Sequence, residues 1–202
     1  MTQVCTTCGF IHNCYCEAIP TIASDLCFTL LTHPNEFQRE TNTGKLVGRV
    51  IKQVNIREWQ RKQPDPYCLP ESSVLTPVLV FPDQDSMPLT QWQTQHPSAS
   101  NFIVLDGTWQ EAKKMLNRSQ WLQNLPKVHL EATQSSQYQL RRNQEVGNLC
   151  TFEVCAQMVR ELESSDDANA MLTFFEQYLQ WFQAERSGHA LSKLFSIKHV
   201  IT

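Results

Sequence analysis

The sequence predicts an α/β fold in which a mainly parallel β-sheet is flanked by helices. Three unbroken apolar runs indicate strands, at Leu26–Leu31, Pro77–Phe81 and Phe102–Leu105. Runs without a polar face are typical of parallel strands, which helices cover on both sides. Segments with helical periodicity alternate with strands along the chain, and this alternation favours parallel pairing. A shorter run at Val128–Leu130 predicts one further strand.

The helices are predicted from apolar spacing and from residues that commonly begin them. Gln110–Leu116 consists of good helix formers, and Thr108 is placed to cap them. Two more helices are expected after residue 150, where apolar side chains recur at helical spacing, with Thr151 and Asp167 as their caps. Residues 35–54 show mixed helical spacing. Residues 60–76 and 83–100 are rich in proline and polar residues, so we predict loops there.

Length and composition restrict the class of protein. A chain of 202 residues is long enough for one domain with a small appendage. Its apolar runs are much shorter than the roughly 20 residues that span a bilayer. The N-terminus, MTQVCTTCGF, has no basic segment followed by an apolar one, so no secretory signal is expected. We therefore expect no membrane partner and a cytoplasmic location, where eight cysteines would not form a disulfide framework.

The net charge does not decide whether the protein binds nucleic acid. A value of −3 at first argues against such a partner. The deficit lies entirely after residue 150, because basic and acidic residues balance in the first 150 positions. Local basic groups can therefore form a patch for a phosphate backbone, or can equally be solvated helix faces.

Four cysteines near the N-terminus have the spacing of a metal site. They form a C-x2-C-x5-C-x-C pattern at Cys5, Cys8, Cys14 and Cys16. Structural Zn²⁺ takes four tetrahedral ligands, and thiolates this close in sequence surround one ion at little loop-closure cost. We predict structural zinc bound within residues 1–20. An iron–sulfur cluster, which also takes four thiolates, is the main alternative. Cysteines that bind no metal at all are the second alternative.

The segment DGTW, which follows the last of the three apolar runs, is the strongest candidate for a chemical centre. Ligands of parallel sheets bind beyond the carboxyl ends of the strands, where Asp106 would lie. Gly107 permits close approach of a ligand, and Trp109 offers a flat face to a base. The same segment also has a purely structural interpretation, with Thr108 as a helix cap and Trp109 in the core. The motif alone favours neither interpretation.

Three further polar clusters lie beside predicted strand ends or helix starts. They are HPNEFQRETNTG from His33 to Gly44, the pair Arg141 and Arg142, and Thr151 with Glu153. Glu36 in the first cluster and Glu153 in the third can equally be surface charges. Thr151 can equally be a simple helix cap. Several such clusters at strand ends favour a functional site, but they do not specify a reaction.

Taken together, these segments resemble a known family. LTHPNEFQRETNTG, LDGTWQEAKKML and LCTFEVCAQ follow the cysteine pattern in the order found in the DTW-domain family, over essentially the whole chain. Within it, the chain is most similar to bacterial tRNA-uridine aminocarboxypropyltransferases. The resemblance implies an enzyme that transfers the 3-amino-3-carboxypropyl group of S-adenosylmethionine to N3 of a uridine in the tRNA variable loop, releasing methylthioadenosine. It also implies a catalytic domain at residues 21–202 with a SPOUT-like, knotted cofactor site, and zinc at the cysteines.

The resemblance suggests a role for each candidate residue. The expected catalytic residues are Asp106, Thr108 and Trp109. Asp106 would either accept the N3 proton, with its pKa raised by burial, or stabilise the sulfonium electrostatically. The expected cofactor-binding residues are Leu105, Gly107, Thr151 and Glu153. The expected substrate-binding residues are Arg39, Asn42, Thr43 and Arg141.

Three alternatives remain at this point. Two are enzymes, an S-adenosylmethionine-dependent RNA methyltransferase and an rRNA aminocarboxypropyltransferase. The third is a non-catalytic, zinc-bearing RNA-binding module, which would bind RNA without S-adenosylmethionine. All four hypotheses share RNA as a partner, with tRNA favoured, and the sequence does not predict an oligomeric state.

Overall fold

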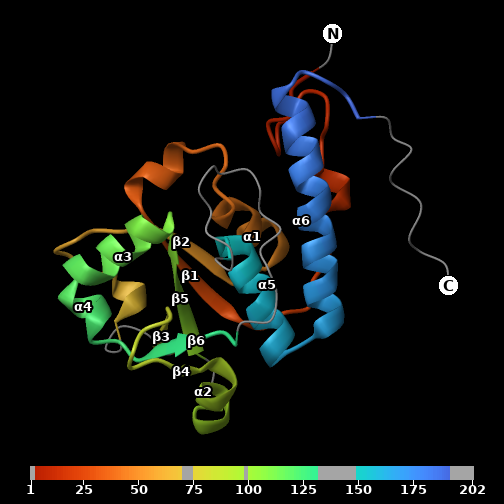
Figure 1. The fold of residues 1–202 in the computed structure, drawn as a ribbon. Coiled ribbons are helices and arrows are strands. Elements are labelled where there is room, and N and C mark those ends of the chain that lie inside the picture. The colour runs from red at the N-terminus through yellow and green to blue at the C-terminus, as the bar shows by residue number, and fades with distance from the viewer. Residues whose placement is uncertain (1–2, 70–74, 98–99, 132–148, 192–202) are drawn as a thin grey trace.

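A parallel β-sheet of six strands forms the centre of the computed structural model, which describes residues 3–69, 75–97, 100–131 and 149–191 (Figure 1). The strand order is β2-β1-β5-β3-β6-β4, and each neighbouring pair is parallel. The strands are β1 (Cys27–Thr32), β2 (Val54–Glu58), β3 (Thr76–Val80), β4 (Met87–Pro88), β5 (Ser100–Asp106) and β6 (Lys127–His129). The predicted α/β fold with a parallel sheet is therefore confirmed.

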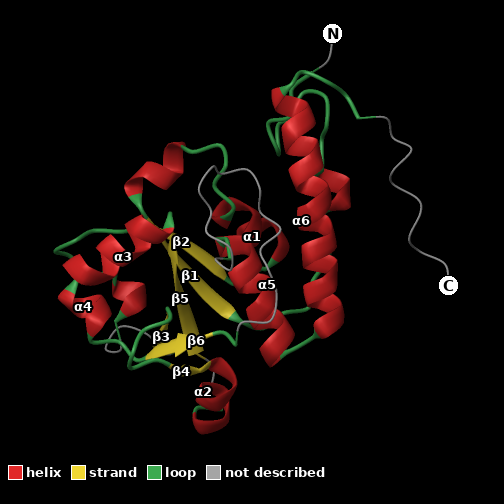
Figure 2. Ribbon diagram, in the orientation of Figure 1, coloured by secondary structure: helices red, strands yellow, loops and turns green. Residues whose placement is uncertain are grey.

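Helices cover both faces of this sheet (Figure 2). The α-helices are α1 (Gly44–Val50), α2 (Leu89–Gln95), α3 (Trp109–Arg118), α4 (Gln120–Gln123), α5 (Thr151–Leu162) and α6 (Ser165–Arg186). The short 3-10 helices are η1 (Cys16–Ala18), η2 (Pro34–Gln38) and η3 (Pro66–Cys68). Helices α3 and α4 lie on one side of the sheet, and α1, α5 and α6 lie on the other. Among the described residues, no helix has both the length and the apolarity that crossing a bilayer requires.

Successive residues of β5 contribute to two different cores. Phe102 and Val104 pack in the larger core with α1, α5 and α6, whereas Ile103 and Leu105 pack in the smaller core with α3. Side chains of a strand alternate between the two faces of a sheet, and every residue of β5 is buried. This two-sided burial explains the unbroken apolar run. By the same alternation, Asp106 faces α1 and α5.

Several predicted element boundaries need correction. The segment 83–100, predicted to be a loop, contains the short β4 and the helix α2. Leu89 and Trp92 anchor α2 in the core, but two apolar residues among polar ones give too little periodicity to detect. The strand β2 was also missed, because it lies at the sheet edge with three of its five residues exposed.

Two predicted helix caps are wrong. Helix α5 has Cys150, not Thr151, as its N-cap, because Thr151 is already helical and its hydroxyl bonds elsewhere. Helix α6 begins after Ser164, whose side chain accepts a hydrogen bond from the Asp167 N–H. Asp167 therefore lies in the first turn. The predicted end near Gly188 is confirmed, since Gly188 has a φ of 69° just beyond the helix, as is usual for a helix-terminating glycine.

Candidate active site

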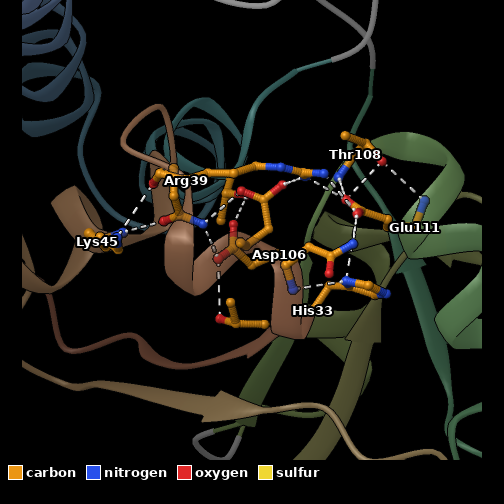
Figure 3. Close-up of polar contacts among 11 residues, drawn as sticks. His33, Arg39, Lys45, Asp106, Thr108 and Glu111 are labelled. Carbon is orange, nitrogen blue, oxygen red and sulfur yellow. Dashed lines mark hydrogen bonds and ion pairs between the residues drawn. The ribbon is translucent and has the colours of Figure 1, made fainter.

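Asp106 ends β5 at the carboxyl edge of the sheet and is the centre of a buried polar network (Figure 3). It is only 3% exposed. Its carboxylate accepts hydrogen bonds from Asn42 Nδ2 at 2.7 Å, Thr151 Oγ1 at 2.7 Å and Thr32 Oγ1 at 3.1 Å. These donors come from the loop before α1, the first turn of α5 and the end of β1. One carboxylate thus joins three separate elements, and it brings together Asp106, Asn42 and Thr151, which the sequence had proposed for different roles.

The environment of Asp106 favours its protonated form more than water does. Burial raises the pKa of the Asp106 carboxyl above its usual value, and the negative charge of Glu36 acts in the same direction. The hydrogen bonds from Asn42, Thr151 and Thr32 oppose this shift because they stabilise the carboxylate. A buried acid with a raised pKa next to a second acid is a common feature of functional sites.

Glu36 is the second acid, and it is completely buried. It is ion-paired with Arg39 and accepts a hydrogen bond from Asn42 Nδ2 at 3.1 Å. The Asn42 amide is oriented by the Lys45 main-chain N–H, which donates to Asn42 Oδ1 at 3.0 Å. Its nitrogen therefore faces both Glu36 and Asp106. The surface interpretation of Glu36 is wrong, because η2 turns this side chain inward, and no sequence signal predicts that turn.

Arg39 links this buried pair to the start of α3. Its guanidinium donates to both carboxylate oxygens of Glu111, at 2.8 and 3.0 Å, while it also pairs with Glu36. Burial opposes ionisation of Glu111, but the bonds from Arg39 and Thr108 prevail and lower its pKa to about 2. Arg39, predicted to bind substrate, is thus engaged in intramolecular ion pairs (Figure 3).

Glu111 was missed by the sequence analysis, although a signal for it exists. Thr108 and Glu111 form a capping box, in which each side chain bonds the main-chain N–H of the other residue. A threonine followed three residues later by a glutamate is the sequence signature of this motif. The predicted cap at Thr108 is confirmed.

Gly44 begins α1 directly against the Asp106 carboxylate. A Cβ atom at position 44 would lie 2.7 Å from Asp106 Oδ2 and 2.8 Å from its Cγ. Real Cβ atoms essentially never come this close to another heavy atom, so the packing of α1 on Asp106 requires glycine. In the sequence, Gly44 was the last residue of the polar cluster HPNEFQRETNTG and had no predicted role of its own.

Trp109 lies away from the Asp106 network. Its indole ring stacks on Phe81 with a centroid separation of 5.0 Å and an interplanar angle of 7°. The Lys113 ammonium lies 5.1 Å from the ring centroid, and Trp109 packs against the smaller core, to which the Leu105 side chain also belongs. This placement favours the core interpretation of Trp109. Gly107 is crowded by protein, since an added Cβ would lie 3.1 Å from the Glu111 Cβ.

The remaining predicted site residues are Thr43, Glu153 and Arg141. Thr43 is buried as the N-cap of α1. Glu153 is 4% exposed and accepts the Cys150 N–H at 2.8 Å, so its interpretation as a surface charge is wrong. It is drawn inward because it lies at the third position of α5, where a carboxylate caps the helix. Arg141 lies outside the described residues.

The four N-terminal cysteines gather as a metal site requires. Their Sγ atoms all lie within 4.8 Å of one another. The separations are 3.8 Å for Cys5–Cys16, 3.7 Å for Cys8–Cys14 and 3.5 Å for Cys5–Cys14. A tetrahedron with Zn–S bonds of about 2.3 Å has edges of about 3.8 Å. The geometry fits one Zn²⁺, whereas the thiolates of an iron–sulfur cluster bind different iron atoms and stand farther apart.

The loop that carries the four cysteines, residues 5–16 (the cysteine loop), contacts the C-terminal part of α6. The Glu185 carboxylate accepts hydrogen bonds from the main-chain N–H groups of Ile11, His12 and Asn13. Phe10 packs against Tyr178 and Phe182 of α6, with ring centroids 6.2 Å apart in each case. The cluster of four cysteines therefore lies beside the larger core, and its loop forms part of the surface next to α1 and α6.

The fold and site define an α/β protein with a buried carboxylate pair at the carboxyl edge of a parallel sheet and a cluster of four cysteines that can hold a metal ion. The model of the DTW domain matches residues 2–183, and the chain belongs to the DTW-domain family. It is 30% identical over 178 residues to a tRNA-uridine aminocarboxypropyltransferase 2 from Drosophila melanogaster, an alignment that covers 79% of this chain and 66% of that protein.

A protein of the same name from Macaca fascicularis is 24% identical over 196 residues, which cover 92% of this chain and 65% of that relative. The chain thus spans about two thirds of the length of the curated relatives it matches. No solved structure matches it significantly.

Proposed function

We propose that this protein transfers the 3-amino-3-carboxypropyl group of S-adenosylmethionine to N3 of a uridine in tRNA, with the variable loop as its target. Membership of the DTW-domain family and the names of the two relatives support this activity. The structural observation that carries it is the Asp106 network, which places a buried negative charge at the carboxyl edge of the sheet. Ligands bind at this edge in parallel α/β proteins.

The transfer is a substitution at the carbon next to the sulfonium. The N3 lone pair forms a bond to the Cγ of the aminocarboxypropyl group, and the C–S bond breaks with its electrons going to sulfur. Methylthioadenosine leaves as a neutral thioether, and the N3 proton passes to a base or to solvent. Three carbons of the sulfonium are open to attack, so the protein must align Cγ with N3. Alignment is therefore the main demand on the site.

The positions around Asp106 suit a cofactor pocket of this kind. We assign the pocket to the main chain at Leu105 and Gly107 and to the first turn of α5 with Thr151 and Glu153, where helix N–H groups favour a carboxylate. The SPOUT-like knot that the resemblance implies belongs to this proposal. Asn42, which bonds both acids, and Thr43, the N-cap of α1, support the pocket through the Asp106 network and the start of α1.

For Asp106, the geometry favours the electrostatic role over that of the base. Both of its oxygens accept hydrogen bonds from neutral donors, and the residue is 3% exposed, which limits direct contact with a uracil ring. A buried charge nevertheless acts through space, since two unit charges 4 Å apart interact by about 4 kcal/mol near a protein surface. Asp106 thus stabilises bound sulfonium and holds the surrounding elements in place.

The proposal is tested by incubating the protein with unmodified tRNA and S-adenosylmethionine, followed by nucleoside mass spectrometry. We expect 3-(3-amino-3-carboxypropyl)uridine in the RNA and methylthioadenosine in solution. S-adenosylhomocysteine in place of methylthioadenosine would identify a methyltransferase instead. Modification of rRNA but not of tRNA would identify an rRNA aminocarboxypropyltransferase. RNA binding without affinity for S-adenosylmethionine would identify a non-catalytic RNA-binding module.

We further propose that the four cysteines hold one structural Zn²⁺, which organises the loop that packs on α6. Replacing Cys14 by serine is expected to remove zinc, because the tetrahedral site loses one of its four thiolates. Because the loop then loses its packing on α6, the thermal unfolding midpoint should fall by at least about 4 °C. Elemental analysis and calorimetry measure the two effects.

Cys27→Ser is the matched control, since Cys27 lies outside the cluster and serine can keep its hydrogen bond to Gln53. This variant should retain one zinc per chain. Iron with acid-labile sulfide in the wild-type protein, or a Cys14→Ser variant that keeps its full zinc content, would contradict the assignment.

A further inference from the structure

A cleft of about 460 Å³ lies between the cysteine loop, α1 and the C-terminal part of α6. Figure 1 shows the N-terminal loop beside this end of α6. The residues that carry the following argument line this cleft: Phe10, Asn42, Lys45, Arg49, Glu185 and Arg186. They come from segments far apart in the sequence, so the cleft exists only in the folded chain. Neither the proposed cofactor pocket nor the zinc site accounts for it.

Three cations line the cleft: Lys45 and Arg49 on α1, and Arg186 on α6. Within the part of the chain that the structure describes, none of them forms an ion pair with a carboxylate. The Lys45 ammonium donates to the Phe37 carbonyl oxygen at 3.2 Å, and the Arg49 guanidinium donates to that of Thr7. Carbonyl oxygens carry no formal charge, so these bonds orient the cations without neutralising them.

Two acids also line the cleft, and one of them already has charge-stabilising partners. Burial opposes ionisation of Glu185, but hydrogen bonds from the N–H groups of the cysteine loop lower its pKa. Its carboxylate is directed at that loop. Glu40 is exposed to solvent. Three cations and two carboxylates therefore line the cleft, next to the proposed zinc ligand Cys8. Among the described residues the three cations form no ion pair with a carboxylate, and cations that are not neutralised in this way attract an anion.

Asn42 connects the cleft to the Asp106 network. Asn42 lines the cleft, and its Nδ2 donates to Asp106 Oδ2 at 2.7 Å. A polyanion with one phosphate on Lys45 and Arg49 would thus lie next to Asn42, which bonds both buried carboxylates. The stacking of Arg186 over the Phe182 ring, 5.9 Å from its centroid, adds a flat cationic surface at the cleft.

We infer that this cleft binds the phosphodiester backbone of the substrate RNA next to the target nucleotide. The inference rests on the proposed function and identifies the surface that positions the RNA for it. Contacts to phosphate set the register of a nucleic acid without reading its sequence. A cleft whose cations lack carboxylate partners among the described residues, and which Asn42 joins to the Asp106 network, fits that task.

The test compares a triple variant, Lys45→Gln, Arg49→Gln and Arg186→Gln, with the wild-type protein. Glutamine keeps an N–H donor for the carbonyl oxygens while it removes the charge. The Kd for unmodified tRNA, measured by fluorescence anisotropy, should rise at least about tenfold at 0.1 M salt, and the salt dependence of binding should weaken by a slope of about 2. Affinity for S-adenosylmethionine, measured by calorimetry, should stay within about twofold of that of the wild-type protein, because the cofactor is assigned to another pocket.

The matched control is Lys52→Gln, Lys62→Gln and Lys114→Gln, which removes the same charge from exposed positions that do not line the cleft. An equal loss of tRNA affinity in this control, or an unchanged tRNA affinity in the cleft variant, would overturn the inference. A selective loss of S-adenosylmethionine binding would also overturn it, since the cleft would then be a cofactor pocket. The single variant Arg186→Gln, near the end of α6, provides the same comparison if the triple variant unfolds.

Failure of the proposed function gives a different result. A wild-type protein that binds tRNA but forms no product contradicts the proposed transfer, while the affinity ratio of the two triple variants still tests the cleft.

Discussion

Replacing Gly44 by alanine is expected to lower the free energy of unfolding by about 1–3 kcal/mol, a usual effect of overpacking, and to abolish most of the transfer activity. The added Cβ would lie 2.7 Å from Asp106 Oδ2. Asp106 has a short side chain held by Asn42, Thr151 and Thr32, so it cannot move without losing hydrogen bonds. Chemical denaturation and product formation with tRNA measure the two effects.

Gly48→Ala in the same helix is the matched control. The nearest atom to a Cβ at position 48 is Ile56 Cδ1 at 3.9 Å, which is an ordinary contact. Because alanine favours the helix over glycine, this variant should gain about 0.5–1 kcal/mol and keep its activity. Equal behaviour of the two alanine variants would contradict the claim that Gly44 is required by the Asp106 carboxylate.

Replacing Asp106 by asparagine is expected to weaken binding of S-adenosylmethionine, and so to reduce transfer at limiting cofactor, while the fold stays intact. Asparagine has the same shape, its oxygen can accept from Asn42 and Thr32, and the Thr151 hydroxyl can rotate to accept from its nitrogen. The negative charge, however, is lost. The sulfonium is positive before transfer and neutral afterwards, so an electrostatic role acts mainly on bound S-adenosylmethionine. Its Kd should rise at least about tenfold, or 1.4 kcal/mol.

Calorimetry with S-adenosylmethionine and steady-state kinetics with tRNA separate the two roles of Asp106. An unchanged Kd together with a large loss of turnover would reassign Asp106 to the general base, because a base is needed only when the N3 proton leaves. A fully active variant would remove Asp106 from the mechanism.

The stability of the Asp106→Asn variant follows from the raised pKa of Asp106. The folded state binds the Asp106 proton more strongly than the unfolded state does. In the unfolded state the pKa of this carboxyl group is about 3.8. The carboxyl group therefore contributes stability below pH 3.8, and this contribution is lost as the pH rises through the folded-state pKa. At neutral pH the variant should equal or exceed the wild type in free energy of unfolding, as is common when a functional residue is removed.

Local sequence patterns were sufficient for the class of fold and for the gathering of the four N-terminal cysteines. The apolar runs at Phe102–Leu105 and Pro77–Phe81 identify buried parallel strands, because burial on both faces leaves no polar alternation. The four cysteines lie within twelve residues, so their spacing alone is enough to suggest one tetrahedral ion. Asp106 was also identified, since a polar residue directly after a buried strand lies at the ligand-binding edge of a parallel sheet.

Long-range packing determined which residues surround Asp106 and what they do. Glu36 and Gly44 meet Asp106 from more than 60 positions away in the sequence, and no local periodicity encodes the close approach of α1 to β5. Trp109, three residues after Asp106 in the motif, packs against the smaller core on the other face of the sheet. It does so because β5 ends at Asp106 and α3 begins at Trp109. A sequence pattern reports the environment of one element, whereas a site at the junction of β1, β5, α1 and α5 depends on how those elements pack.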